Sequence, residues 1–176
     1  MNIPLILNSI RPKAAWSLSG DFDTLVWLDT AQTKPTLAEI SAGALSAEKA
    51  AFILQVKAEA GDLTQQVLQG LGSEYELAEK EANVYKAADY PTTPVPYSVQ
   101  AEINSKAAKG VTITATNACD NILAAATGWR NAQASLRDSR LTTVSAAGVA
   151  VDAISLDAIK AQWVAFMAAL QEQLGV

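Results

Sequence analysis

The chain has 176 residues, a net charge of -5, no histidine and one cysteine. Without histidine a Ser-His-Asp triad is impossible, and the dispersed glycines form no phosphate-binding loop, so nothing indicates an enzyme, a metal site or a cofactor. Lysine and arginine are scattered through both halves of the chain, which argues against nucleic acid as a partner.

The start of the chain and its apolar stretches bear on its location. The first residues, MNIPLILN, lack the basic region and the cleavage site of a secretory signal. The longest nearly uncharged stretches, Leu141–Val151 and Ala161–Leu170, are shorter than the ~20 residues that span a bilayer. We therefore expect a soluble protein, made in the cytoplasm, that has no membrane contact. Cys119 is then a small core residue rather than a nucleophile.

Residues 1–35 predict a small β-hairpin unit. Two stretches rich in strand-forming residues flank a turn at Gly20, and they place Trp16 and Trp27 opposite each other as cross-strand partners. Ile3–Ile10 could add a third strand. Because an isolated hairpin is only marginally stable in water, this unit must pack on a helix or on another chain.

The hairpin region contains a close grouping of carboxylates, Asp21, Asp23 and Asp29. Such a grouping could bind a hard cation or divide acid and base roles. Aspartate beside a turn glycine is more often held by local hydrogen bonds, and we favour that interpretation.

Helical sequence begins after the hairpin. Thr36 and Glu39 form a capping box, in which each side chain can bond the backbone amide of the other residue. A seven-residue apolar spacing then continues through residues 36–90, across an expected kink at Gly70–Gly72, after which Ser73 would cap the next helix. The residues on this line are Val56, Leu63, Gly70, Leu77 and Val84.

Prolines interrupt the helical pattern once. They are Pro91, Pro94 and Pro96. They predict an extended linker at residues 91–97, because proline removes a backbone donor and excludes helix before it. A short helix over residues 98–109 follows, closed by Gly110 in the position after the cap.

The rest of the chain predicts a helical hairpin. Thr116 or Asn117 caps a long helix, a turn of small residues covers 145–153, and Ser155 with Asp157 opens the last helix.

Both helices of this hairpin carry apolar seams with the 3,4 spacing of helix–helix packing. The first seam consists of Ile122, Trp129 and Leu136, beside Ala118, Ala125 and Ala132. The second consists of Leu156, Ile159, Trp163, Phe166 and Leu170. Aromatic residues at such positions could line a ligand pocket but are more often core. The spacing leaves open whether the helices pack within one chain or between chains.

Three arginines, Arg130, Arg137 and Arg140, lie three to seven residues apart in the first of these helices. They could accept a carboxylate from a partner. A solvated helix face is the simpler interpretation, with Asp120 and Asp138 available to interleave.

Together these patterns predict a mainly α fold, with a small N-terminal β-hairpin unit followed by an alanine-rich helical bundle or coiled coil. The expected organisation is a docking unit at 1–35, a helical segment at 36–90, a proline-rich linker at 91–97 and a helical hairpin at 98–176.

Three blocks in the first 40 residues resemble the N-terminal region of small tail proteins of tailed bacteriophages. They are Ile10–Gly20 (IRPKAAWSLSG), Leu25–Asp29 (LVWLD) and Lys34–Ile40 (KPTLAEI). They correspond in order to the family's LRP-x-A-x-W-x-L-x-G, WLD and KPT-x-x-E-I segments, except that glycine or an acidic residue is common in the family near Lys13. The alanine-rich remainder is similar in style to tail-fibre or baseplate accessory proteins.

The resemblance implies a non-enzymatic structural protein of the virion tail, made in the host bacterium. Its partners would be other tail-fibre or baseplate proteins, and three-fold fibres imply a homo-oligomer, most simply a trimer. Trp16 and Trp27 would anchor the hairpin, and the Arg11 guanidinium could pair with a partner carboxylate. Packing within the chain is an equally good interpretation of all three side chains.

Two other functions remain open at this stage. One is a tail-fibre assembly chaperone, built from the same helical surfaces but absent from the finished particle. The other is a small hydrolase that acts on the bacterial surface, although the missing histidine counts against it.

Overall fold

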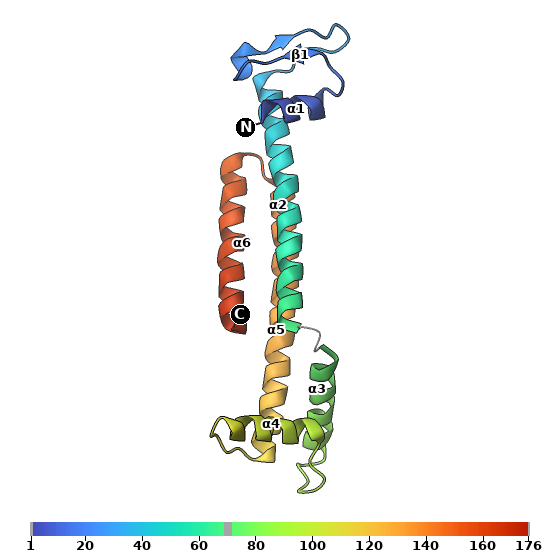
Figure 1. The fold of residues 1–176 in the computed structure, drawn as a ribbon, viewed down its shortest axis with the longest axis vertical. Helices are drawn as coiled ribbons and strands as arrows, with labels where there is room; N and C mark the ends of the chain where they lie inside the picture. Colours follow the sequence, from blue (N-terminus) through green and yellow to red (C-terminus); the bar gives the residue numbers. More distant parts are fainter. Residues whose placement is uncertain (1, 69–71, 176) are drawn as a thin grey trace. The chain divides into compact units, whose positions relative to one another are not determined.

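The computed structural model of the protein describes residues 2–68 and 72–175. Figure 1 shows the predicted mainly α fold with its small hairpin near the N-terminus. The elements in chain order are α1 (Ile3–Ile10), β1 (Trp16–Ser17), the 3-10 turn η1 (Phe22–Thr24), β2 (Val26–Trp27), α2 (Leu37–Leu68), α3 (Gly72–Ala87), α4 (Tyr97–Ala108), α5 (Ala115–Val149) and α6 (Ala153–Leu174).

The chain divides into two compact units, and each unit joins two segments that are far apart in the sequence. The first unit joins Met1–Ala58 to Arg140–Phe166, and the second joins Glu59–Ser139 to Met167–Val176. Each unit therefore takes one part of α2, of α5 and of α6.

The hairpin in the first unit has the predicted register. β1 and β2 pair antiparallel, with Trp16 opposite Trp27 and Ser17 opposite Val26. The strands are only two residues long, and they are stabilised by packing on helices, as a two-stranded unit requires. Its buried core contains Ile3, Ile6, Leu7, Leu25 and Ile40.

The prediction of a third strand at Ile3–Ile10 is wrong, because this segment is helix α1. The Asn2 side chain caps the helix by accepting from the Leu5 amide at 3.2 Å. Pro4 lies in the first turn, where its missing N–H has no partner to lose. Ile3, Ile6 and Leu7 recur at helical spacing and are the buried residues of α1.

The capping box at the start of α2 is confirmed. The Glu39 amide donates to Thr36 Oγ1 at 3.1 Å, and the Thr36 amide donates to Glu39 Oε2 at 2.7 Å. Gly43 in the next turn lets α1 pack closely, since a Cβ there would lie 2.8 Å from Cγ2 of Ile6 and 3.1 Å from Cγ2 of Ile10.

The seven-residue line predicted through 36–90 is buried only in its first half. Val56 and Leu63 are buried in α2, but Leu77 and Val84 are 52% and 64% exposed in α3. Helix α3 buries other positions, Ala82 among them. The predicted kink at Gly70-Leu71 and the side chain of Ser73 lie outside the described residues.

Helices α3 and α4 pack on each other in the second unit. Glu81 of α3 accepts from the Ser98 amide at 2.9 Å and so caps the first turn of α4. The predicted closure at Gly110 is confirmed: its φ is 77°, and it donates to Ala107 while Val111 donates to Lys106, the pattern of a Schellman motif.

The caps of the last two helices lie earlier than predicted. Thr114, not Thr116 or Asn117, caps α5, since its Oγ1 accepts from the Asn117 amide at 3.1 Å. Asp152 caps α6 by accepting from the Ser155 amide at 2.7 Å. The turn predicted at 145–153 is reduced to three residues, because its alanines favour helix and extend α5 to Val149.

By length and composition alone, α6 could cross a membrane, and it is the one such helix among the described residues. Core helices of soluble proteins meet the same criterion. In the first unit, Leu156 and Trp163 of α6 are buried, with 0% and 1% exposure, so this helix packs on protein there.

Candidate functional site

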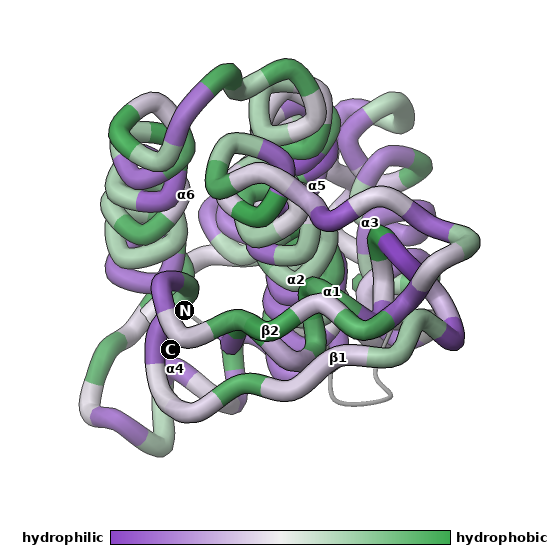
Figure 2. The backbone as a smooth tube through the Cα atoms, turned by 90° about the horizontal axis from the view of Figure 1, so that it is seen from above, coloured by the Kyte–Doolittle hydropathy of each residue, from purple (hydrophilic) through white to green (hydrophobic). Residues whose placement is uncertain are grey.

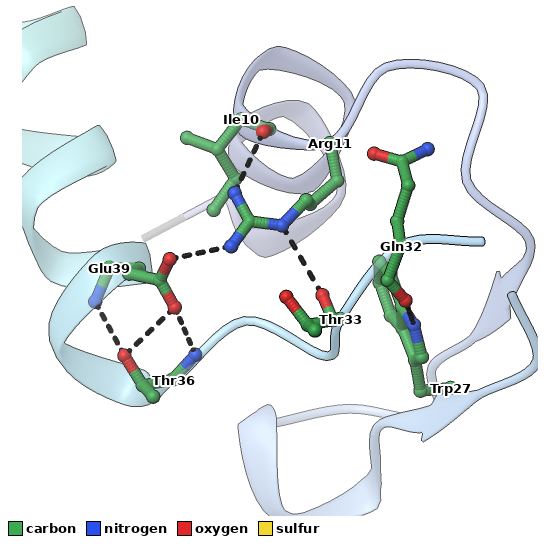
Figure 3. Close-up of polar contacts among 7 residues, drawn as sticks. All are labelled: Ile10, Arg11, Trp27, Gln32, Thr33, Thr36 and Glu39. Atoms are coloured by element: carbon green, nitrogen blue, oxygen red, sulfur yellow. Dashed lines mark hydrogen bonds and ion pairs between the residues drawn. The ribbon is translucent and has the colours of Figure 1, made fainter. Parts of the chain in front are cut away.

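The Arg11 side chain is the centre of a hydrogen-bond network in the first unit (Figure 3). Its Nη2 donates to Glu39 Oε1 at 2.5 Å, its Nη1 to the Ile10 carbonyl at 3.1 Å, and its Nε to the Thr33 carbonyl at 3.3 Å. The guanidinium therefore joins the end of α1, the loop before α2 and the first turn of α2. This geometry uses the fork of donors that distinguishes arginine from lysine.

The hydrogen bonds around Glu39 change its ionisation. The pKa of the Glu39 carboxyl is lowered from 4.5, first by the bond from the Thr36 amide and then by the Arg11 guanidinium. The folded chain therefore stabilises the charged carboxylate form of Glu39.

The two tryptophans anchor the hairpin from within. Trp16 and Trp27 are partly buried against the core of the first unit. Trp27 Nε1 also donates to the Gln32 carbonyl at 2.8 Å, as Figure 3 shows. The Gln32 side chain in turn donates to the Pro12 carbonyl at 3.1 Å. Trp27 therefore supports the loop that carries Thr33 to Arg11.

Asp29 fixes the turn after β2. Its Oδ1 accepts from the amides of Ala31 at 2.7 Å and Gln32 at 2.8 Å, and its Oδ2 accepts from the Ala15 amide at 3.3 Å. These bonds, the one from Gln32 first, lower the pKa of the Asp29 carboxyl below 3.8. No group of three metal-binding side chains occurs among the described residues. The aspartate grouping was interpreted either as a cation or acid–base site or as a turn held by local hydrogen bonds. The local hydrogen bonds account for Asp29.

The outer side of β2 carries exposed apolar side chains. Side chains alternate along a strand, so Val26 and Leu28 face away from the side of Trp27. They are 55% and 58% exposed. In the hydropathy colouring of Figure 2, short hydrophobic stretches at β2 lie between hydrophilic parts of the neighbouring loops. These two residues form the outer strand face.

Except for Ala125 of α5, which is exposed, the helical seam residues are buried or partly buried. Leu136 of α5 is 7% exposed, and Trp163 and Leu170 of α6 are 1% and 4% exposed. The other predicted seam residues, Ile122, Trp129, Ile159 and Phe166, are partly buried. The rings of Trp163 and Phe166 lie 5.7 Å apart with a 33° tilt. Each seam therefore contributes to the fold of a single chain.

Two ion-pair groups were not predicted from the sequence. Lys160 of α6 pairs with Glu48 of α2 and, at 3.1 Å, with Asp157 of α6. Its pKa is raised, chiefly by the hydrogen bond to Glu48. The i,i+3 spacing to Asp157 is visible in the sequence, but Glu48 is 112 residues away and carries no such signal.

The second group lies in the second unit. Asp120 of α5 accepts from Lys86 Nζ at 2.8 Å and from the Tyr90 hydroxyl at 3.1 Å. Next to it, the buried Cys119 thiol donates to the Ala82 carbonyl at 3.2 Å, and burial raises its pKa. A neutral, bonded thiol is a core residue.

One arginine of the predicted basic face is engaged within the chain. Arg130 pairs with Glu79 of α3, and it also donates to Thr127 at 3.3 Å. Asp120, expected to interleave with the arginines, instead binds Lys86.

The chain was compared with protein-family models, with curated proteins and with solved structures, and none of the three comparisons finds a match.

Proposed function

We propose that this chain is a non-enzymatic protein of the tail of a tailed bacteriophage, attached to or part of the tail-fibre and baseplate apparatus. One observation supports this most strongly: the three blocks that resemble phage tail proteins meet in one hydrogen-bonded unit. Arg11 of the first block bonds Glu39 of the third, and Trp16 of the first pairs with Trp27 of the second. The shared residues thus specify one small docking unit.

This docking unit binds its partner through the outer strand face. The Arg11 guanidinium and the tryptophans are engaged inside the chain, so they position the unit rather than contact the partner. Val26 and Leu28 present branched apolar side chains on the opposite side of the strand. Exposed apolar side chains on a rigid support are suited to a protein partner.

The test is binding to the tail. The variant Val26→Asp/Leu28→Asp is expected to lose capture of tail-fibre or baseplate proteins from a lysate of the phage that encodes this chain. A matched control, Leu77→Asp/Val84→Asp, changes two apolar residues of α3 with similar exposure and should bind like the parent chain. Equal capture by both variants would rule out the outer strand face as the docking surface.

The second candidate function is a tail-fibre assembly chaperone, and one observation favours it. Trp163, Leu136 and Leu170 are buried within one chain, so these three seam residues are not available to another subunit. A chain that buries these residues without a partner can bind a tail-fibre protein during assembly and then dissociate from it. Mass spectrometry of purified particles separates the two: a structural component remains in the finished tail, whereas a chaperone is found only in infected cells.

A further inference from the structure

The backbone of β1 has an unpaired edge. In an antiparallel ladder, residue pairs that exchange hydrogen bonds alternate with pairs whose N–H and C=O groups point outward. The Leu28 amide donates to the Ala15 carbonyl at 2.9 Å, so the next pair, Trp16 and Trp27, is of the second kind. The N–H and C=O of Trp16 therefore point away from β2.

The same edge continues past β1 to Leu18. The Ser19 amide donates to Thr24 Oγ1 at 3.1 Å, so the two halves of the hairpin are still joined one residue beyond Leu18. By the alternation of the ladder, the N–H and C=O of Leu18 point to the same side as those of Trp16. No hydrogen bond joins these four backbone groups to any other part of the chain that the structure describes.

The opposite edge of the hairpin is already engaged. The Leu25 carbonyl, just before β2, accepts from Lys34 Nζ at 2.9 Å. The loop that carries Lys34 also accepts from the Trp27 indole through the Gln32 carbonyl. In Figure 2, β2 lies between β1 and α1. The edge of β1 is therefore the one that an incoming chain can reach.

The sequence of this edge lacks the usual protection against pairing. Residues 14–20 contain no charged residue and no proline, and Lys13 and Asp21 lie on either side of them. Proteins commonly protect an edge strand with charges, prolines or bulges, because its free backbone groups pair with another strand. A helix cannot satisfy these groups, since its own backbone bonds are internal. The backbone pattern therefore selects an extended segment as the occupant.

The side chains of β1 leave room for large side chains on such a segment. On the face that carries Val26 and Leu28, the exposed residues of the β1 segment are Ser17, opposite Val26, and Ala15, opposite Leu28. Strands pair about 4.8 Å apart, so the outer strand face lies roughly 10 Å from a strand added at β1. Long apolar side chains can lean over the small residues and contact it.

We propose that an extended segment of a partner protein, with bulky apolar residues at alternate positions, adds to β1 as a third strand. Its backbone pairs with Trp16 and Leu18, and its side chains contact the outer strand face. A third strand also stabilises a hairpin that is marginal by itself. The proposal rests on the proposed docking unit and specifies the conformation in which the partner binds.

Selection of peptides by the purified full chain tests the proposal without any phage protein. The probe is a ribosome-displayed library of random peptides of about nine residues, the length of a long strand. The selected peptides should carry bulky apolar residues at alternate positions. A bound peptide should slow amide exchange at Trp16 and Leu18 about tenfold or more, and leave Thr30 in the loop after β2 unchanged. No selected peptide, or unchanged exchange at Trp16 and Leu18, would overturn the proposal.

A charge on the edge strand gives a second readout. Ser17→Lys should weaken binding of the selected peptides about tenfold or more, because a charged side chain blocks edge pairing. Thr30→Lys places the same charge at another exposed position of the docking unit and should bind like the parent chain. Circular dichroism establishes that both variants are folded. Equal affinities of the two variants would contradict pairing at β1.

The peptide test and the capture test fail separately. Peptide pairing at β1 without capture of tail proteins would refute the phage assignment and leave the strand-binding edge in place. Capture of tail proteins that leaves exchange at Trp16 and Leu18 unchanged would refute the strand addition and leave the phage assignment in place.

Discussion

Arg11 and Glu39 are 28 residues apart in the chain, and their side chains meet in a hydrogen bond of 2.5 Å. The same carboxylate completes the capping box with Thr36, so one residue both starts α2 and fastens the preceding unit to it. The local signal and the long-range contact therefore stabilise the same turn of helix.

Replacing Arg11 by alanine should lower the thermal midpoint of unfolding, because the bonds to Glu39, Thr33 and Ile10 are lost together. Arg11→Lys should restore only part of the loss, since an ammonium cannot reproduce the guanidinium fork. A double-mutant cycle with Glu39→Ala measures the coupling directly by thermal unfolding. Additive effects of the two single variants would show that the pair is energetically independent.

Acid should weaken the first unit through Glu39. Its pKa is lowered in the folded chain, so its stabilising contribution is complete above 4.5, the pKa of the free side chain, and is lost as the pH falls through the lower folded value. Unfolding in denaturant between about pH 5 and about pH 3 should therefore show a steeper loss of stability in the parent chain than in Glu39→Gln. Identical slopes for the two proteins would contradict this role.

Gly43 and Gly61 lie in the same helix and should respond oppositely to alanine. At Gly43 a Cβ would meet Cγ2 of Ile6 at 2.8 Å, a methyl on a stiff branched side chain, so Gly43→Ala should destabilise by about 1–3 kcal/mol. At Gly61 nothing lies within 4 Å, and alanine should stabilise by about 0.5–1 kcal/mol. Chemical denaturation of both variants measures the difference, and a stabilising Gly43→Ala would mean that α1 does not pack there.

Trp163 should contribute more to stability than its neighbour Val164. Trp163 is 1% exposed, and its truncation to alanine should cost about 3–5 kcal/mol in the free energy of unfolding. Val164 is 60% exposed, and Val164→Ala should stay within about 0.5 kcal/mol of the parent chain at concentrations where the chain is a single copy. Comparable losses at the two positions, measured by denaturant titration, would place the seam elsewhere on α6.

Lys13 occupies a backbone conformation that suits glycine, with φ of 64°. A residue with a side chain loses about 1–2 kcal/mol there, and glycine loses about 0.5–1 kcal/mol in chain entropy. Lys13→Gly should therefore raise the unfolding free energy by up to about 1 kcal/mol, and Lys13→Ala should give no gain. Thermal unfolding of the two variants decides between relief of strain and simple loss of the lysine charge.

Much of the fold follows from local patterns. The pairing of Trp16 with Trp27, the box formed by Thr36 and Glu39, and the closure at Gly110 depend on neighbouring residues, and all three are present. The α6 seam through Trp163 follows from helical spacing alone. Such signals depend on interactions within a few residues, which a sequence displays directly.

Other features were decided by the tertiary structure. Ile3–Ile10 has an apolar content that fits a strand or a helix; Asn2 and Pro4 favour the helix, and only packing sets its place beside Gly43. The pairing of Lys160 with Glu48 joins residues 112 positions apart, for which no spacing rule exists.

The mainly α fold, the hairpin register and the helix ends at Thr36 and Gly110 follow from the sequence, because they depend on local backbone hydrogen bonds and side-chain alternation. Long-range packing sets the bond of Arg11 within the chain, the burial of Leu136, Trp163 and Leu170, and the exposure of Leu54 and Val164. Burial depends on which elements meet in space, and that is settled by long-range packing.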